Sequence, residues 1–217
     1  MRSPESVGAI EHAHEDEALI YFRGTADASY ADRADRCRRH VLFVKEQQYL
    51  VLVDEFVAKR GMASALQWNI HSWGAFETDG ERAFWTERGN STLYGHVMHN
   101  RAGFFSLTEG WDPPPMRGKD SAQWLQQYHL RFTPNGIEVP KRNLGVVLCW
   151  DHAGWSKPAV ETHLHGDTEV AQVGDDLVLV NGGTGISYRG HVSDAVVWML
   201  IGGRKYAVRD EGLIRQP

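Results

Sequence analysis

The sequence predicts an all-β fold, a β-sandwich of stacked antiparallel sheets with very little helix. Short runs rich in β-branched and aromatic residues recur along the 217 residues, and turn-forming residues separate them. Almost no stretch shows the roughly 3.6-residue apolar period of a helix. Hydrophobic residues make up 42% of the chain, which is enough for a sizeable core. We therefore expect residues 1–217 to form a single β-sandwich domain.

The strongest strand signal lies in residues 36–57, RCRRHVLFVKEQQYLVLVDEFV. Two apolar runs, 41–44 and 49–53, are joined by a short polar link, as in an antiparallel hairpin. Both faces of the second run are apolar, so we expect other layers to cover this strand on both sides. Arginines before the first run lie opposite Asp54 and Glu55 after the second. Cross-strand arginine–carboxylate pairs should therefore help fix the register.

The remaining strands follow from the same patterns, taken in chain order. Residues 17–23 are expected to form the first strand, and the polar connection 24–35 has room for a helical turn. After the hairpin, residues 64–73 alternate apolar and polar side chains, which places Trp68 in the core. Residues 109–122, with consecutive prolines and no periodicity, predict a long surface loop. The other expected strands cover residues 75–78, 82–86, 92–98, 103–108, 124–133, 144–150, 168–173, 177–181, 195–201 and 205–208.

Charge and apolar run length argue against two kinds of partner. The net charge of −5 is unfavourable for nucleic-acid binding, which usually requires clustered Lys and Arg. No apolar run reaches the roughly 18–20 residues that span a bilayer, so we expect no membrane partner. The polar N-terminus has no apolar signal-peptide segment, and the compartment stays open. Cys37 and Cys149 are interpreted as free thiols rather than as a disulfide.

Tryptophan is unusually frequent, with eight residues in the chain. In β proteins the indole ring serves either as core or as a stacking platform for sugars. The candidate sugar-binding rings, which fall in irregular segments or at a strand end, are Trp73, Trp111 and Trp155. Arg101, Arg117 and Lys119 are the cations expected near an acidic sugar. The alternative is that these rings fold back and cap the open ends of the sandwich.

Two histidine pairs have a spacing that suits metal ligands. The pairs are His12 with His14 and His163 with His165. Each pair would place two imidazoles on one strand face, where Asp16 or Asp167 could complete a site. A preformed metal site usually needs three supported ligands. We therefore interpret both pairs as solvent-exposed histidines and expect neither metal nor cofactor.

The run RRHVLFVKEQQYLVLVDEF, residues 38–56, stands in a distinctive order of motifs. A tyrosine precedes it in ADASYADRADR, and a strand with a Trp and a His, LQWNIH, follows it. This order resembles the C-terminal β-domain of heparinase II/III-type polysaccharide lyases, in which strands of R-x-V-L-F-V-K, V-V-V-D and W-x-x-H type follow one another. The correspondence covers about residues 19–72, and from there onward only the strand rhythm is similar.

Complete members of this family carry more than this chain does. The resemblance implies a preceding α/α-toroid, whose cleft supplies the Tyr and His that move protons during β-elimination, and metal-binding segments of H-x-H-x-D, D-x-G and H-N-T type. This sequence has no helical repeat. Residues 12–16, HAHED, lack a matching D-x-G strand, and His99-Asn100 continues into Arg101. No catalytic residue therefore carries over.

Two function classes remain open beside a weaker third one. The resemblance implies a non-catalytic β-sandwich domain, inactive alone, that packs on the toroid of a bacterial, periplasmic or secreted parent. There it would help shape the cleft for an acidic polysaccharide such as a glycosaminoglycan or alginate. The alternative is a free-standing carbohydrate-binding module that uses its loop tryptophans. The third reading is a metal-dependent enzyme built on the histidine pairs.

Overall fold

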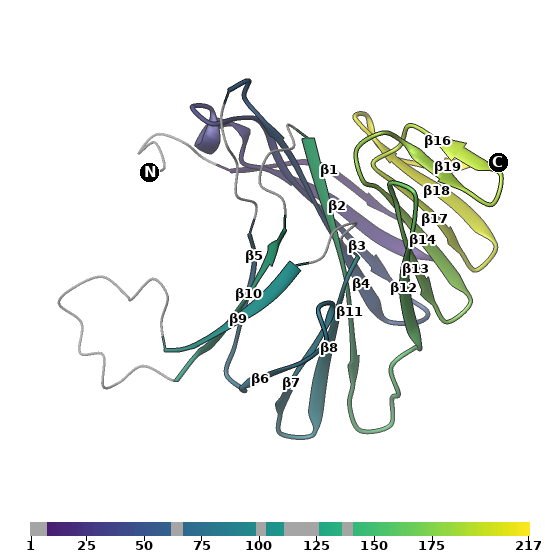
Figure 1. The fold of residues 1–217 in the computed structure, drawn as a ribbon. Helices are drawn as coiled ribbons and strands as arrows, with labels where there is room; N and C mark the ends of the chain where they lie inside the picture. The colour runs from purple at the N-terminus through teal and green to yellow at the C-terminus, as the bar shows by residue number, and fades with distance from the viewer. Residues whose placement is uncertain (1–7, 62–66, 99–102, 111–125, 136–140) are drawn as a thin grey trace.

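The computed structural model describes residues 8–61, 67–98, 103–110, 126–135 and 141–217, which form packed antiparallel sheets (Figure 1). The largest sheet has eight strands in the order β1-β2-β3-β4-β11-β8-β7-β6. In chain order they are β1 (Ala9–Glu15), β2 (Leu19–Thr25), β3 (Ala34–Val44), β4 (Tyr49–Ala58), β6 (Phe76–Asp79), β7 (Ala83–Arg88), β8 (Ser91–Val97) and β11 (Lys141–Asp151). β4 and β11 are therefore neighbours in the sheet although β5 to β10 come between them in the chain.

The central hairpin is confirmed as β3 and β4, joined by a turn over residues 45–48. Arg38 pairs with Glu55 and Arg39 with Asp54 across the two strands. Arg39 makes a bidentate ion pair with Asp54, in which Nε donates to Oδ1 at 2.5 Å and Nη2 donates to Oδ2 at 2.6 Å. The expected register is therefore confirmed. The short 3-10 helix Asp27–Tyr30 supplies the helical turn expected before β3.

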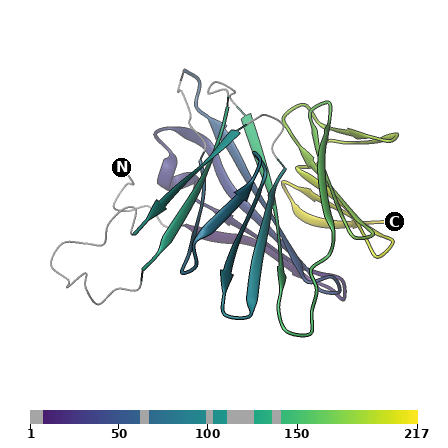
Figure 2. The same ribbon diagram turned by 60° about the horizontal axis from the view of Figure 1, so that its bottom comes forward.

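A six-stranded sheet packs against one face of the large sheet (Figure 2). Its strands, in sheet order, are β12 (Val160–His165), β13 (Thr168–Val173), β14 (Asp176–Asn181), β17 (Val197–Ile201), β18 (Arg204–Arg209) and β19 (Gly212–Gln216). The main core lies between the two sheets. There Tyr49, Val51 and Val53 of β4 are fully buried together with Val178 and Val180 of β14.

A three-stranded sheet covers part of the opposite face of the large sheet. Its strands are β5 (Trp68–Ser72), β10 (Tyr128–Pro134) and β9 (Gly103–Glu109), in the sheet order β5-β10-β9. Trp68 is only 2% exposed and packs with Phe84 and Phe132, so its predicted core position is confirmed. Leu50 and Leu52 of β4 border the same cluster. β4 is thus covered on both sides, as expected for this strand, and the all-β sandwich with stacked antiparallel sheets is confirmed.

Glycine on β8 makes close packing possible in this second core. Phe84 of β7 lies opposite Gly95, and a Cβ at Gly95 would come within 2.0 Å of the Phe84 ring. Any side chain there would therefore push the ring away from the sheet. In the outermost layer, the hairpin of β15 (Ile186–Tyr188) and β16 (His191–Ser193) covers the six-stranded sheet through contacts with Trp198.

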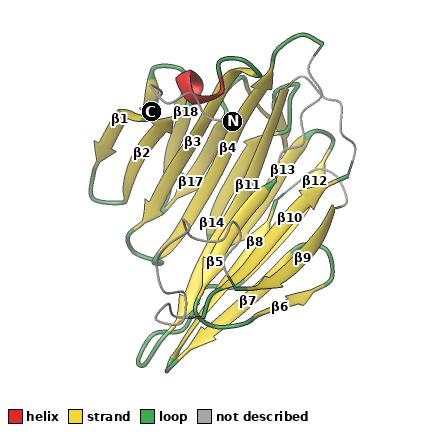
Figure 3. Ribbon diagram, turned by 90° about the vertical axis from the view of Figure 1, so that its left-hand side faces the viewer, coloured by secondary structure: helices red, strands yellow, loops and turns green. Residues whose placement is uncertain are grey.

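The small sheet leaves the β1–β3 end of the large sheet open on its side (Figure 3). Directly paired residues share a face, and Phe22 pairs with Val41 while Ile20 pairs with Phe43. Ile10 lies on this face too, opposite Gly24, and is 71% exposed, while Phe22 is 39% exposed. We name this apolar surface, Ile10, Ile20, Phe22, Val41 and Phe43, the open face.

Five strands have no counterpart among the expected ones. They are β1, β12, β15, β16 and β19. The expectation that residues 17–23 form the first strand is wrong, because β1 precedes β2. β1 is an edge strand and mostly exposed, so its pairing rests on backbone hydrogen bonds and leaves little apolar signal. β15 and β16 have three residues each, too few for a period to be visible.

Both cysteines are free, as expected: Cys149 is buried and Cys37 half-buried. No helix in the described residues is long and apolar enough to cross a membrane.

Candidate functional site

A stripe of polar and aromatic side chains follows β5, which is an edge strand of the small sheet. Successive side chains of a strand point to opposite faces, so Trp68 and Ile70 enter the core while their neighbours point away from it. Gln67, Asn69 and His71 are exposed, and Trp73 continues the same alternation. We call Gln67, Asn69, His71 and Trp73 the β5 stripe.

Trp73 is the sequence-predicted sugar residue that the structure places most openly. Its side chain is 51% exposed, and the Arg88 guanidinium carbon lies 3.9 Å from the ring centroid. Together with His71, Ser72 and Gln127 they line a hollow of about 310 Å³. An exposed indole beside a cation suits the apolar face and the negative group of an acidic sugar.

A second hollow of about 300 Å³ adjoins the first one. It shares His71, Ser72 and Arg88 with it and adds Trp150 and His152 from the large sheet side. The Trp150 ring stacks on Phe43 of the open face, with centroids 6.2 Å apart and planes inclined by 12°. Neither Trp150 nor Arg88 was singled out from the sequence, because each lies within an expected strand or next to its end.

Trp155, the other predicted sugar residue within the described ranges, lies away from Trp73. Trp155 is half-buried, its indole Nε1 is buried without a hydrogen-bond partner, and the chain turns back there through a bridge to His152. It lines neither hollow at Trp73. The remaining predicted residues fall outside the described ranges: Trp111, Arg101, Arg117 and Lys119. Sugar binding at all these positions stays a prediction.

The His12 and His14 pair lies on edge strand β1, beside an aspartate that is already engaged. His14 Nε2 is 3.8 Å from Asp16 Oδ2. Asp16 accepts hydrogen bonds from two backbone N–H groups and from the Tyr206 hydroxyl, at 2.8 Å for the last. Burial opposes ionisation of this carboxyl, but these donors prevail and lower its pKa.

The His163 and His165 pair shares one face of β12, as its spacing predicts. Both rings pack on Tyr188, with centroid distances of 5.8 Å and 5.5 Å. Asp167 instead accepts a hydrogen bond from Thr184 Oγ1 at 2.8 Å. Across the described ranges, no group of three His, Cys, Asp or Glu side chains is arranged to hold a metal ion.

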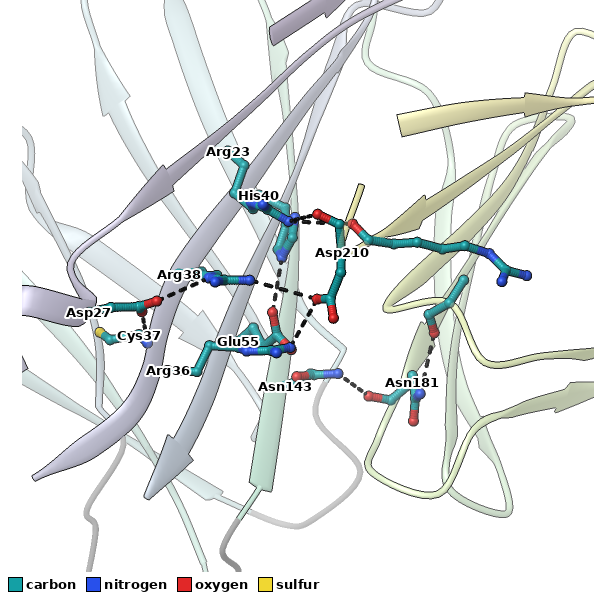
Figure 4. A network of polar contacts seen from close by, with 12 residues as sticks. Arg23, Asp27, Arg36, Cys37, Arg38, His40, Glu55, Asn143, Asn181 and Asp210 are labelled. Carbon is teal, nitrogen blue, oxygen red and sulfur yellow. Dashed lines mark hydrogen bonds and ion pairs between the residues drawn. The ribbon is translucent and has the colours of Figure 1, made fainter. Parts of the chain in front are cut away.

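A buried polar cluster lies where the large sheet meets the β18–β19 turn (Figure 4). Arg36 donates to Glu55 Oε1 at 2.7 Å and to Asp210 Oδ1 of that turn at 3.1 Å. His40 Nε2 lies 3.6 Å from Glu55 Oε2, and its Nδ1 lies 3.2 Å from the Tyr21 hydroxyl. The two sheets are therefore joined by charges as well as by apolar contacts.

Electrostatics in this cluster favour an ionised Glu55. Burial raises the pKa of its carboxyl, but the close approach of His40 and the hydrogen bond and charge of Arg36 outweigh burial and lower the pKa to about 2. Burial raises the pKa of Tyr21 to about 12. Tyr, His and Glu are the residue types of proton transfer, yet Tyr21, His40 and Glu55 are at most 1% exposed. A substrate therefore has no access to them, and the cluster is structural.

Sequence reasoning found the arginine–carboxylate pairs of this cluster but missed its burial. A signal does exist, because His40 is in phase with Leu42 and Glu55 is in phase with Val53. A strand has two alternating sets of side chains, and the position of the partner sheet determines which set faces the core. The sequence alone does not show this position.

These features define a layered all-β sandwich with an exposed polar and aromatic stripe on its three-stranded sheet. Solved structures share the fold. Heparan sulfate lyase HepC from Pedobacter heparinus is similar with a TM-score of 0.54 and 12% identity, over 97% of this chain and 28% of that one. A mutant of HepC gives 0.53 and 11%, over 97% and 28%. A heparinase III with methylated lysines gives 0.50 and 12%, over 96% and 27%.

At such identities the likeness shows the fold alone, and it confirms the fold expected from the family resemblance. The chain spans less than a third of the length of these proteins. No family model matches the chain, and no curated protein sequence matches it.

Proposed function

We propose that residues 1–217 form a non-catalytic β-sandwich domain of a polysaccharide lyase of the heparinase II/III type. In this proposal the domain packs on an α/α-toroid of the same parent protein and helps shape the cleft for an acidic polysaccharide. Two findings support it: the fold is shared with heparan sulfate lyase HepC, and it accounts for only 28% of that chain.

The observation that carries the proposal is the open face. Ile10 and Phe22 are 71% and 39% exposed at an end of the eight-stranded sheet that the small sheet leaves open, whereas the middle strands β4 and β11 are packed on both sides by the described residues. Contiguous exposed apolar surface on a soluble domain marks an interaction site. Interfaces between domains of one chain bury about 600–1,500 Å², which a face of three strands can supply.

The first prediction tests this docking. We expect the chain to co-elute with a toroid fragment of the parent protein in size-exclusion chromatography, and the double variant Ile10→Glu, Phe22→Glu to abolish co-elution because it places charges in the interface. Val192→Glu is the matched control, since Val192 is 78% exposed on the remote β16. Wild-type chain that stays monomeric beside the toroid fragment would contradict the proposal.

The second prediction is that this chain alone does not cleave uronic-acid polysaccharides. β-Elimination needs a base, an acid and a carboxylate-neutralising group within about 3 Å of the reacting atoms. Tyr21 and His40 are buried, and His71 stacks on His129 with centroids 4.4 Å apart. Incubation with heparan sulfate, alginate or hyaluronan should leave ultraviolet absorbance unchanged, with no unsaturated uronyl ends. An increase that disappears with His71→Ala would show the opposite.

A second candidate function is a free-standing carbohydrate-binding module. The exposed Trp73 ring under Arg88 favours it, because this surface could hold a sugar without help from another domain. The two candidates differ in what the open face does. If the chain binds glycan but does not co-elute with the toroid fragment, the result favours a free-standing module.

A further inference from the structure

A further hollow lies at the opposite end of β5 from Trp73. It has a volume of about 670 Å³ and is bordered by Gln67 and Asn69 of the β5 stripe. The β3–β4 hairpin contributes Arg39, Asp54 and Phe56, and the 3-10 helix contributes Tyr30. We call this hollow the Arg39 groove.

The Arg39 groove has the chemistry of a sugar site. The side chain of Arg39 is 47% exposed and makes a bidentate contact with Asp54, so the pair offers donors and acceptors side by side. Sugar hydroxyls donate and accept at once, and such planar paired groups match them. Tyr30 and Phe56 add ring surface for the apolar face of a sugar.

Between the two ends, the stripe is held in place by neighbouring strands. Asn69 Oδ1 lies 3.0 Å from His129 Nε2 and accepts from Arg131 Nε at 3.2 Å. His71 stacks on His129 with centroids 4.4 Å apart and planes inclined by only 5°. Side chains that are already ordered lose little conformational entropy when a ligand binds.

The geometry along β5 connects these sites. Gln67 and Asn69 border the Arg39 groove, whereas His71 borders the Trp73 hollow and the hollow that adjoins it. The six-residue step from Gln67 to Trp73 spans about 20 Å at roughly 3.3 Å per residue, long enough for several linked sugar rings.

The two ends of the stripe differ in charge. The described residues that border the Trp73 hollow include Arg88 and His71 but no carboxylate. In the Arg39 groove, by contrast, both arginines are already paired with carboxylates, Arg39 with Asp54 and Arg38 with Asp27. A negatively charged sugar is therefore favoured at the Trp73 end, and an uncharged ring fits the Arg39 end.

We propose that the β5 stripe is a track for one linear acidic glycan, which places a carboxylate or sulfate at Arg88 and a neutral ring at the Arg39–Asp54 pair. This inference rests on the proposed function for the class of ligand only. It assigns the glycan to the edge of the small sheet rather than to the open face.

Calorimetric titration of the chain with heparan sulfate oligosaccharides of increasing length, and with a neutral linear glucan, tests the track. Trp73→Ala should weaken binding of both glycans about tenfold, the affinity equivalent of one stacked ring. Arg88→Gln should weaken only the acidic glycan and reduce its salt dependence. Arg215→Gln is the control, since Arg215 is 53% exposed on β19 of the six-stranded sheet; it should not alter binding.

Length dependence separates a track from a single site. Arg39→Gln should weaken long oligosaccharides and leave the shortest ones unchanged, because short ligands occupy only the Trp73 end. Arg39→Lys keeps the positive charge but loses the bidentate contact with Asp54, so it should have the same effect as Arg39→Gln. Thermal melts verify that each variant is folded. Absence of glycan binding, or an Arg39 effect that does not depend on length, would overturn the track.

The outcome is independent of the docking test. The docking variants change Ile10 and Phe22, which border neither end of the track. Wild-type chain that binds glycan but not the toroid fragment would remove the proposed function and leave the track. Wild-type chain that binds the toroid fragment but not glycan would remove the track alone.

Discussion

Val51→Asp is expected to leave the protein unfolded. Val51 is fully buried in the middle of β4, within the core between the two largest sheets. An unpaired carboxylate there costs several kcal/mol, against a total stability of roughly 5–15 kcal/mol. Circular dichroism during urea titration measures the effect. Leu52→Asp should cost less, because Leu52 lies on the small-sheet side of β4 and is half-buried.

A matched control is available on the surface of the same fold. Val192→Asp makes the same chemical change at a residue that is 78% exposed, so its unfolding midpoint should stay close to that of the wild type. A cooperative, nearly unchanged transition for Val51→Asp would show that β4 is not central to the core.

The second large effect is expected from Arg36→Met. This change leaves Glu55 buried without its shortest ionic contact, the 2.7 Å hydrogen bond to Arg36 Nη1. Breaking a buried pair costs about 3–5 kcal/mol, and we expect the low end because Arg36 is 29% exposed. Urea unfolding at neutral pH measures the loss. The double variant Arg36→Met, Glu55→Gln should recover part of it, since no charge is then stranded.

The same ion pair determines how stability changes in acid. Glu55 has a folded pKa of about 2 against an ordinary value of 4.5. A depressed carboxyl pKa stabilises the fold fully above the unfolded value, and this contribution disappears as the pH falls through the folded one. The wild type should therefore lose about 3 kcal/mol between pH about 4.5 and 2 from this group. Arg36→Met should make the free energy of unfolding depend less on pH in this range. An unchanged pH dependence would show that Arg36 does not cause the lowered pKa of Glu55.

The sequence was sufficient to predict the parts of the fold in which local pattern and burial agree. The β3–β4 hairpin shows a two-residue period and complementary charges at its ends, so its strands, turn and register could all be predicted. Trp68 was predicted as core for the same reason. The edge strand β1 was not predicted, because one row of backbone hydrogen bonds, rather than an apolar face, holds it in the sheet.

The candidate site was less accessible to prediction. Trp73 could be found because it stands at the end of an alternating strand. Its partner Arg88 is on β7, and the Arg39 groove combines β3, β4, β5 and the 3-10 helix. Such convergence depends on how sheets stack, which a single sequence does not encode in any local period.

The adjacency of β4 and β11 has a consequence for folding. β4 ends at Ala58, whereas the strand that pairs with it begins only at Lys141. During synthesis the apolar β4 therefore has an unpaired edge until most of the chain has been made, and such edges template aggregation. Closing a loop of this length also slows the search for the native pairing. Refolding from denaturant should accordingly be slow and sensitive to protein concentration, and a chain truncated before β11 should be insoluble even though its hairpin is complete.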